Sequence, residues 1–490
     1  MTSAARSAFP RLTFPQLWVA LAILLPVLAA LIATMSTVDL AYNVRAGELM
    51  LDQGAVLRTD PFTFTAGGGA WLDQQWGAQI LLALGYRAGG WALLALIRAG
   101  LVAAVMGLVF VACRRSGAGL RVAAWLTLAA FILASAAMGM RPQLFGMVLF
   151  AATVAILAGR SRLTGRSGWL LWLVPVLVVP WASIHGSFFL APAAVGIAWL
   201  EDLAAGRPGT RKLLAVAIAS GLASLLNPFG LGVWTYTIGL STNPTIRRLI
   251  TEWQPTSPLS ATGLLLYGSM LVFAILLVFR YRGAVGGSRV ALVRRIGPTL
   301  LWLVFLGLVA AAAQRGIAWW ALAAPVAVAR LLKPDVEAAQ AEARPERASI
   351  LNGAIVVVLA LVGLVLLPFW RGNGLLTDAP TGITTALAAR VSPNDRVWNA
   401  QAWGSWFELA LPGVPIAVDS RIEVIPTAAW DDHLALSAGA PNWEAILDRW
   451  KVTVVVASGD EQAGLIPLIQ ASSAWSQVYQ DADGFVFVRR

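Results

Sequence analysis

The feature that most constrains this chain is a series of apolar segments that recurs from about residue 17 to residue 369. A helix of about 20 apolar residues spans the hydrocarbon core of a bilayer. Hydropathy predicts about eleven such spans, at 17–35, 91–112, 122–140, 143–159, 168–184, 187–204, 212–226, 262–279, 297–313, 317–332 and 349–369. Only 12% of the residues are charged, against about 25% in soluble domains. A water-soluble globular protein is therefore excluded, and we predict a polytopic α-helical membrane protein.

The distribution of charge predicts the orientation of these spans. With the N-terminus in the cytoplasm, the loops on that side carry 20 of the 36 basic residues but only 6 of the 25 acidic residues. Cytoplasmic loops are enriched in Lys and Arg, so we expect the N-terminus in the cytoplasm and the C-terminus outside. The net charge of +11 is then a topological signal, and no nucleic-acid partner is expected. The first span is too long for a signal-peptide core and is interpreted as an uncleaved anchor.

Two polar segments are predicted to lie outside the membrane. The first is a long loop, 36–90, with helical patterns at 40–53 and 74–88 around a glycine-rich turn at 67–69. The second is the tail 371–490, with strand-like runs at 395–399, 414–419, 452–457 and 484–488, helical patterns near 401–410, 442–450 and 461–472, and a hairpin turn at 481–484. We therefore predict a membrane domain, 1–370, that includes the loop, and a small extracytoplasmic α/β domain, 371–490.

The first outside loop carries the acids that are best placed for chemistry. Asp39 follows the first span closely, where a partly desolvated carboxylate is a good proton acceptor, although Asp also favours the N-cap of the helix that follows. Asp60 precedes Pro61 and can equally initiate a turn. The loop acids Glu48, Asp52 and Asp73 are interpreted as solvated or salt-bridged. The loop has no closely spaced pair of aspartates, so a metal cofactor is not expected.

Several short motifs together resemble the bacterial GT-C glycosyltransferases, which include mannosyltransferase-like and aminoarabinose-transferase-like enzymes that use polyprenyl-phosphate sugars. In the loop these are Asp39, Gly47, Gly54, Asp60 to Phe62, Thr65 and Trp71. Later pieces are Trp181 to Phe188, Asn227 to Gly230, Ile250 to Trp253, Val418 to Arg421, and the run from Trp475 through Tyr479 to Asp481. The resemblance implies a GT-C-like fold with many spans in the bacterial inner membrane, catalytic acids in a large first outside loop and a C-terminal domain outside.

The resemblance implies transfer of a sugar from a polyprenyl-phosphate donor to a lipid, glycan or protein acceptor in the cell envelope, at the outside face. It assigns Asp39 as the catalytic base and Asp60 as either a partner of that base or a residue that orients the acceptor. The donor phosphate needs cations, and the candidates at outside ends of spans are Arg141, Arg315, Arg247 and Arg248. Arginine near hydrocarbon is costly and therefore a functional candidate. The alternatives are snorkelling to membrane lipids and, for Arg247 and Arg248, pairing with Glu252.

Candidates for a sugar-binding cavity are His185, Glu252, Trp253 and Arg45. A histidine beside apolar spans is also a common structural hydrogen-bonder, and Trp253 is equally suited to anchor at the membrane interface. In the tail, Asp419, Arg421 and Glu423 follow a strand, and a structural Asp–Arg pair is favoured there over ligand binding.

Two other functions are compatible with a polytopic chain. A transporter or flippase of a lipid-linked or polar substrate is one, although charged residues are nearly absent inside the predicted spans. A non-catalytic membrane scaffold that recruits an envelope partner through its tail is the other.

Overall fold

The computed structural model describes residues 9–162, 165–281, 289–332 and 346–490. The predicted cytoplasmic arginines Arg6, Arg282 and Arg344, and Lys333, lie outside these ranges. The chain forms two compact units. Unit 1 comprises Met1–Ala33, Ala92–Leu231 and Ile250–Gly372, and unit 2 comprises Thr34–Trp91, Gly232–Leu249 and Asn373–Arg490.

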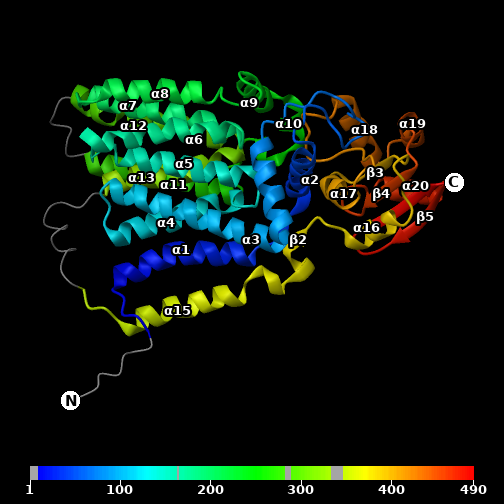
Figure 1. Ribbon diagram of the computed structural model, residues 1–490, viewed down its shortest axis with the longest axis horizontal. Helices are drawn as coiled ribbons and strands as arrows, with labels where there is room; N and C mark the ends of the chain where they lie inside the picture. Colours follow the sequence, from blue (N-terminus) through cyan, green and yellow to red (C-terminus); the bar gives the residue numbers. More distant parts are fainter. Residues whose placement is uncertain (1–8, 163–164, 282–288, 333–345) are drawn as a thin grey trace, which may run out of the picture. The chain divides into compact units, whose positions relative to one another are not determined.

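Unit 1 is a helical bundle in which α1, α4, α5, α6 and α13 run side by side (Figure 1). Its helices are α1 (Phe14–Ile32), the second part of α3 (Trp76–Arg115), α4 (Leu120–Ala134), α5 (Pro142–Ala158), α6 (Leu173–Ala182), α7 (Leu190–Ala204), α8 (Thr210–Ala223), α11 (Ala261–Tyr281), α12 (Arg289–Ala312), α13 (Ile317–Leu331) and α15 (Ile350–Val365). Within the described ranges, six segments are long and apolar enough to cross a membrane: Phe14–Ile32, Trp76–Arg115, Leu120–Ala137, Gly186–Ala204, Ala261–Arg280 and Ile350–Trp370. The predicted polytopic helical class is confirmed, whereas the predicted number of eleven spans is not.

Helix α3 is interrupted where the sequence predicts a boundary. Gly90 has a φ of +58°, in the left-handed region that glycine adopts readily, and Gly89 is extended with φ −166°. The segments on either side match the predicted helix at 74–88 and the predicted span at 91–112. The chain passes from unit 2 into unit 1 at this break.

The C-terminal end of α1 is held by two arginines. The last carbonyls of a helix lack intrahelical donors and attract cations. Arg98, which is buried, donates from Nη2 to the carbonyl oxygens of Ala30 at 2.5 Å and Ala33 at 2.6 Å. Arg371 donates from Nη1 to the carbonyl oxygen of Leu31 at 2.7 Å. The contact fixes the point at which the chain leaves α1.

Unit 2 is built from the first loop and the tail together. Strand β1 (Met35–Ser36) pairs in parallel with β2 (Leu376–Thr377), and α2 (Thr37–Gln53) packs against α17 (Gln401–Ala410). Further along the loop, the Phe64 amide donates to the carbonyl of Ile416 at 2.9 Å. The predicted division at residue 370 thus separates two segments that belong to one compact unit.

The tail contributes a four-stranded sheet with the order β3–β4–β6–β5. β3 (Val397–Asn399) is parallel to β4 (Val454–Ser458), and β6 (Gly484–Arg489) is antiparallel to both β4 and β5 (Trp475–Gln480). The connecting helices are α16 (Thr381–Ala388), α17, α18 (Thr427–Ser437), α19 (Trp443–Arg449) and α20 (Leu465–Ala471), and unit 2 also holds α9 (Gly232–Thr242) and α10 (Pro244–Leu249). The predicted small α/β architecture is confirmed.

Two details of the tail differ from the sequence prediction. The run at 414–419 is not a strand, because it forms only isolated bridges from Ile416 to Val397 and to Thr63. Strand β5 is absent from the prediction but completes the hairpin, which Asp481 closes by donating its amide to the Gly484 carbonyl at 3.0 Å. The core consists of alternating apolar side chains such as Val454, Val456 and Val486.

Candidate functional site

Unit 1 brings together two arginines that the sequence proposes as phosphate ligands. Arg141 Nη1 donates to Glu252 Oε1 at 2.7 Å, and Arg315 Nε lies 3.5 Å from the other carboxyl oxygen. The Arg315 guanidinium also lies over the Trp253 ring, 5.1 Å from its centroid. Burial opposes ionisation of Glu252, but the two arginines outweigh it and hold the pKa of the carboxyl below its ordinary value. Two cations, one carboxylate and one aromatic face therefore form a single cluster.

Local structure explains how these residues meet. Arg141 is the N-cap residue of α5, and Pro142 follows it at the first helical position, where proline is favoured. The residue before a proline favours an extended backbone, which Arg141 has. Glu252 lies in a short 3-10 turn, Thr251–Trp253, and the segment after this turn is tied to the end of α12. Immediately after that turn, the Thr256 hydroxyl donates to the Ala310 carbonyl at 2.6 Å. This tether places Glu252 beside Arg315, which follows α12 directly.

His185 belongs to the same environment. It is the N-cap of a 3-10 turn, where Nδ1 accepts from the Ser187 amide at 3.1 Å and lies 2.8 Å from the Ser187 hydroxyl. Burial first, and the charge of Arg315 second, lower the pKa of His185 to about 3. The imidazole is therefore neutral at physiological pH, with its proton assigned to Nε2. These contacts match the interpretation of His185 as a structural hydrogen-bonder, and its role in a sugar-binding cavity stays a prediction.

The other two candidate arginines belong to unit 2. Arg247 and Arg248 lie on the short helix α10 and are exposed. Arg248 forms an ion pair with Asp431 at 2.8 Å, in which both side chains are more than half exposed. Since Glu252 instead pairs with Arg141 and Arg315, the predicted pairing of Arg248 with Glu252 is wrong. The sequence spacing suggested one continuous loop helix, but α10 ends at Leu249.

Asp39 occupies the first turn of α2, and it is not the N-cap. Ser36 takes the cap position and accepts from the Val38 amide at 3.3 Å, so the alternative that Asp39 caps this helix is wrong. A negative side chain in the first helical turn is stabilised by the helix dipole. The charge of Asp39 acts on Tyr42, one turn later, whose pKa is raised well above its ordinary value by burial first and by Asp39 second.

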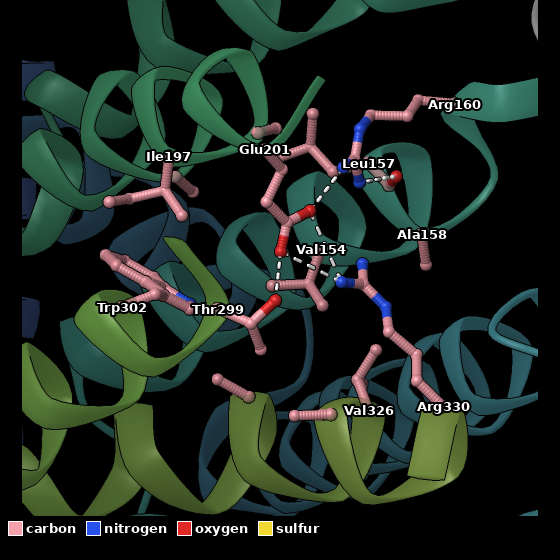
Figure 2. A pocket seen from close by; sticks show the side chains of 14 residues that line it. Val154, Leu157, Ala158, Arg160, Ile197, Glu201, Thr299, Trp302, Val326 and Arg330 are labelled. Atoms are coloured by element: carbon pink, nitrogen blue, oxygen red, sulfur yellow. Dashed lines mark hydrogen bonds and ion pairs between the residues drawn. The ribbon is translucent and has the colours of Figure 1, made fainter. Parts of the chain in front are cut away.

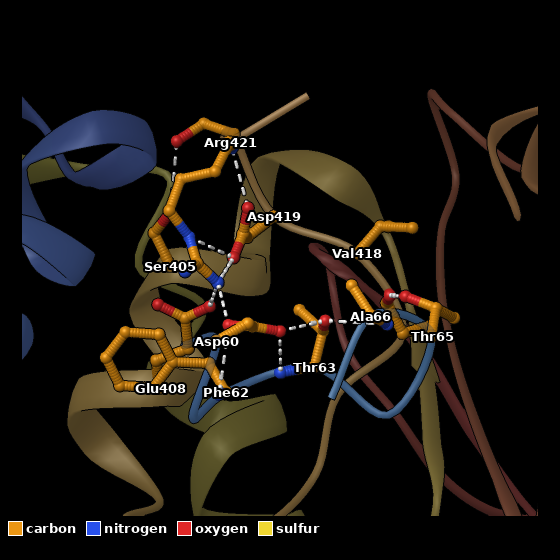
Figure 3. Close-up of polar contacts among 12 residues, drawn as sticks. Asp60, Phe62, Thr63, Thr65, Ala66, Ser405, Glu408, Val418, Asp419 and Arg421 are labelled. Carbon is orange, nitrogen blue, oxygen red and sulfur yellow. Dashed lines mark hydrogen bonds and ion pairs between the residues drawn. The ribbon is translucent and has the colours of Figure 1, made fainter. Parts of the chain in front are cut away.

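Asp60 is fully engaged in a buried ion cluster (Figure 3). Its Oδ2 accepts from the Thr63 amide at 3.1 Å and from the Thr63 hydroxyl at 2.5 Å. Its Oδ1 accepts from the Phe62 amide at 3.2 Å and lies 2.9 Å from Arg421 Nη2. The turn that Asp60 initiates is thus present. Its oxygens are already occupied by donors, which disfavours Asp60 as a catalytic partner.

Arg421 is the centre of this cluster. The Asp419 carboxylate accepts from the Arg421 amide at 2.6 Å and from its Nε at 2.8 Å, so the predicted structural Asp–Arg pair is present. The guanidinium is buried, and it lies over the rings of Trp71 and Phe62, at 4.6 and 4.8 Å from their centroids. A cation over aromatic rings is attracted by their quadrupoles. Arg421 from the tail therefore clamps the first loop.

The remaining loop acids differ in their surroundings. Glu48 pairs with Arg45 at 3.5 Å and Asp52 pairs with Arg87 at 2.5 Å, as a salt-bridged interpretation predicts. Asp73 is neither solvated nor salt-bridged: it is buried and accepts from Gln79 Nε2 at 2.9 Å. Burial is the largest influence on Asp73 and raises its pKa to about 8.

Glu408 is the acid that the sequence analysis missed. It lies on the buried side of α17, and Asp60 and Asp419 are close enough to influence its ionisation. One feature of the sequence indicates that Glu408 is unusual. It shares the otherwise apolar face of a helix with Trp403 and Phe407.

A second ion network lies beside a small pocket in unit 1 (Figure 2). Glu201 on α7 contacts Arg160, Arg330 on α13 and the Thr299 hydroxyl on α12. A cavity of about 70 Å³ lies beside it, lined largely by apolar side chains. The Glu201 carboxylate is shared by Arg160 and Arg330, so the network joins these helices.

The described part of the chain contains no cluster of side chains that could bind a metal ion. No set of three or more His, Cys, Asp or Glu residues there is arranged to hold a metal ion. The expectation of a reaction without a metal cofactor remains a prediction.

Comparisons with known proteins identify the fold. No family model matches the sequence, and no curated protein matches it. Among solved structures, the oligosaccharyltransferase AglB from Archaeoglobus fulgidus is 12% identical, with a TM-score of 0.58 over 97% of this chain and 75% of that one. ArnT from Cupriavidus metallidurans in the apo state is 13% identical, with a TM-score of 0.54 over 96% and 97%. The arabinofuranosyltransferase AftD from Mycobacteria is 17% identical, with a TM-score of 0.56 over 98% and 40%. The chain therefore has the GT-C fold of these membrane glycosyltransferases, as its motifs predict.

Proposed function

We propose that this chain is a membrane glycosyltransferase that moves a sugar from a polyprenyl-phosphate donor to an acceptor on the extracytoplasmic face. The observation that carries this proposal is the cluster of Arg141, Arg315 and Glu252 in unit 1. Two guanidinium groups that converge on one carboxylate are also spaced to hold a phosphate, which guanidinium binds through charge-assisted hydrogen bonds. A solved structure of AglB contains a dolichol-phosphate and an inhibitory peptide, which supports a lipid-phosphate donor here.

The roles follow from the chemistry of glycosyl transfer. Arg141 and Arg315 hold the lipid phosphate, which is both the handle and the leaving group, and stabilise the charge that develops on it. Trp253 offers a face for the sugar ring, and neutral His185 supplies a hydrogen bond. Asp39 takes the proton from the acceptor hydroxyl as it attacks the anomeric carbon. The proposal also includes the topology, with the C-terminus outside, and it places both the sugar and the acceptor on that side of the membrane.

The fold does not favour the transporter or scaffold interpretations, because the matched AglB and AftD structures are named as transferases. Replacing the Asp39 carboxylate by a carboxamide removes the base and keeps the shape of the side chain, so loss of transfer can be distinguished from loss of folding. In the variant Asp39→Asn we expect transfer from a radiolabelled polyprenyl-phosphate sugar to fall by at least about a hundredfold, as loss of a general base does.

The control for that assay is binding of farnesyl phosphate, which Asp39→Asn retains and which Arg141→Gln and Arg315→Gln each weaken. Transfer at the wild-type rate by Asp39→Asn contradicts the proposed mechanism. Unchanged farnesyl phosphate affinity in both arginine variants contradicts the phosphate site. Because the loop lacks paired aspartates, transfer should also survive treatment with EDTA.

A further inference from the structure

Unit 2 contains a cavity of about 680 Å³, within the range of roughly 300–1,000 Å³ that small-molecule sites occupy. It lies between the turn that begins at Asp60, the segments 393–396 and 411–415 of the tail, and one face of α2. Residues more than 300 positions apart in the sequence therefore share one wall. The cavity is formed entirely by residues of unit 2.

One buried polar group in this wall lacks the partners that a buried group requires. Glu408 is 4% exposed, and neither carboxyl oxygen has a hydrogen-bond donor among the described residues. The nearest cation, Arg421 Nη2, is 3.6 Å from Oε1. Asp60 differs in this respect, because both of its carboxyl oxygens accept hydrogen bonds. Buried polar atoms are normally paired, so Glu408 is prepared for a hydrogen bond that a ligand supplies.

The ionisation of Glu408 defines what that ligand offers. Burial first, and Asp419 second, raise the pKa of Glu408 well above its ordinary value, with Arg421 acting in the opposite direction. The protonated carboxyl can donate to Asp419, which is ionised, since Arg421 outweighs burial and holds the pKa of Asp419 below its ordinary value. The carbonyl oxygen of Glu408 then remains as an acceptor, and a ligand hydroxyl is a suitable donor to it.

The remainder of the wall combines apolar and polar groups. Phe64, Leu411 and Val414 provide apolar surface, while Gln53 and Asn394 provide amide donors and acceptors. Sugars present both C–H faces and hydroxyl groups, so a wall of this composition suits them. The lining cations are Arg45, which pairs with Glu48 at 3.5 Å, and Arg396, which donates to the Trp450 carbonyl at 2.9 Å. A guanidinium has five N–H donors, so each arginine keeps donors for a ligand. The lining acids offer less charge, because Asp60 is paired with Arg421 and burial raises the pKa of Glu408.

We propose that this cavity binds an oligosaccharide that carries acidic groups, with Glu408 accepting from a sugar hydroxyl and Arg45 and Arg396 binding the acidic substituent. Binding of such a glycan is independent of sugar transfer. Its identification as the acceptor rests on the proposed function, and it would then narrow the acceptor class to acidic envelope glycans.

Binding of trigalacturonic acid to the purified full chain in detergent, without any donor lipid, tests the proposal by calorimetry. Maltotriose is the neutral probe of equal length. We expect trigalacturonic acid to bind about tenfold more tightly than maltotriose, as a charge-assisted hydrogen bond provides. Glu408→Leu should weaken both ligands by about tenfold, because it removes the acceptor. Glu408→Gln should keep both affinities within about threefold, since an amide donates to Asp419 and accepts from the sugar.

The arginine variants Arg45→Gln and Arg396→Gln should each reduce the preference for trigalacturonic acid by about fivefold and leave maltotriose unchanged. Arg87→Gln, an exposed arginine that does not line the cavity, is the matched control. A thermal melt of each variant confirms that it is folded.

Absence of binding to both sugars by the folded wild-type chain overturns the proposal, and so does an unchanged affinity in folded Glu408→Leu. Tighter binding of a hexaglutamate peptide than of trigalacturonic acid also overturns it, in favour of an acidic peptide ligand. Loss of the transfer activity proposed above leaves these binding results unaffected, so the two failures are distinguishable.

Discussion

Arg141 donates to Glu252 across 2.7 Å although 111 positions separate the two residues. The carboxylate occupies the position between two arginines where the proposed donor phosphate would bind, since Arg315 contacts its other oxygen. A ligand phosphate must therefore displace Glu252 or share the arginines with it.

The first prediction concerns this competition. Glu252→Gln removes the negative charge and should tighten binding of farnesyl phosphate by about fivefold, which corresponds to about 1 kcal/mol for a partly exposed ion pair. The effect should shrink as the salt concentration rises, because salt screens the charges. Calorimetry at low and high salt measures both, with Arg87→Gln as the control. Weaker binding by Glu252→Gln would mean that the carboxylate orients the arginines and does not compete.

The second prediction concerns the clamp at Arg421. Arg421→Leu leaves Asp60 and Asp419 buried without their cation, and such losses typically cost about 3–5 kcal/mol. Thermal unfolding followed by near-ultraviolet circular dichroism measures the effect. Arg248→Gln is the matched control in the same unit: its pair with Asp431 is exposed and should contribute at most about 1 kcal/mol. Equal effects of the two variants would exclude a structural clamp.

The third prediction is a dependence of stability on pH. Because burial raises the pKa of Asp73 to about 8, the folded state keeps a proton that the unfolded state loses near pH 4. The stability that Asp73 contributes is present at low pH and declines between about pH 4 and 8, by at most about 1.4 kcal/mol per pH unit. Asp73→Asn should abolish this decline.

Chemical denaturation of the wild type and of Asp73→Asn at a series of pH values isolates the effect. Glu408 and Glu423 also have a raised pKa, so the difference between the two proteins is the informative quantity. A difference that does not change with pH would contradict the buried, protonated state of Asp73.

The fourth prediction concerns the contact between α2 and the first part of α3. A Cβ atom added to Gly47 would overlap the carbonyl oxygen of Gln79, and backbone cannot move aside as a flexible side chain does. Gly47→Ala should therefore destabilise the protein by about 1–3 kcal/mol. Gly239→Ala is the control, because that helical glycine in unit 2 has open space around it. Equal melting temperatures for the two variants would show that α2 is free to shift.

The sequence could predict which polar residues are energetically unfavourable near the membrane, but not which residues they contact. Arg141, Arg315 and His185 stand out because they lie between apolar spans. A polar group there is energetically costly and is therefore a candidate for a functional role. Their common partner, Glu252, follows only from helix packing, which hydropathy does not describe. In the same way, the residues after Asp60 predict its turn, whereas its burial against Arg421 depends on a contact between the loop and the tail.

The assignment of domains illustrates the same limit. Alternating apolar residues correctly predict β3, β4 and β6, and helical periodicity predicts α17 and α19. A linear division at residue 370 follows naturally from the last apolar span. It fails to group the loop with the tail because hydrogen bonds such as that from Thr65 to Ala417 join residues that are 352 positions apart.

The clamp of Arg421 on the aromatic rings of the first loop has a consequence for biosynthesis. During translation the loop leaves the ribosome long before residue 421 does, so Trp71 and Phe62 remain uncovered while every intervening helix is inserted. Unit 2 can complete its core only after the tail has been made. Chains that stop before the tail would thus display an unfinished aromatic surface to the chaperones and proteases that inspect new membrane proteins.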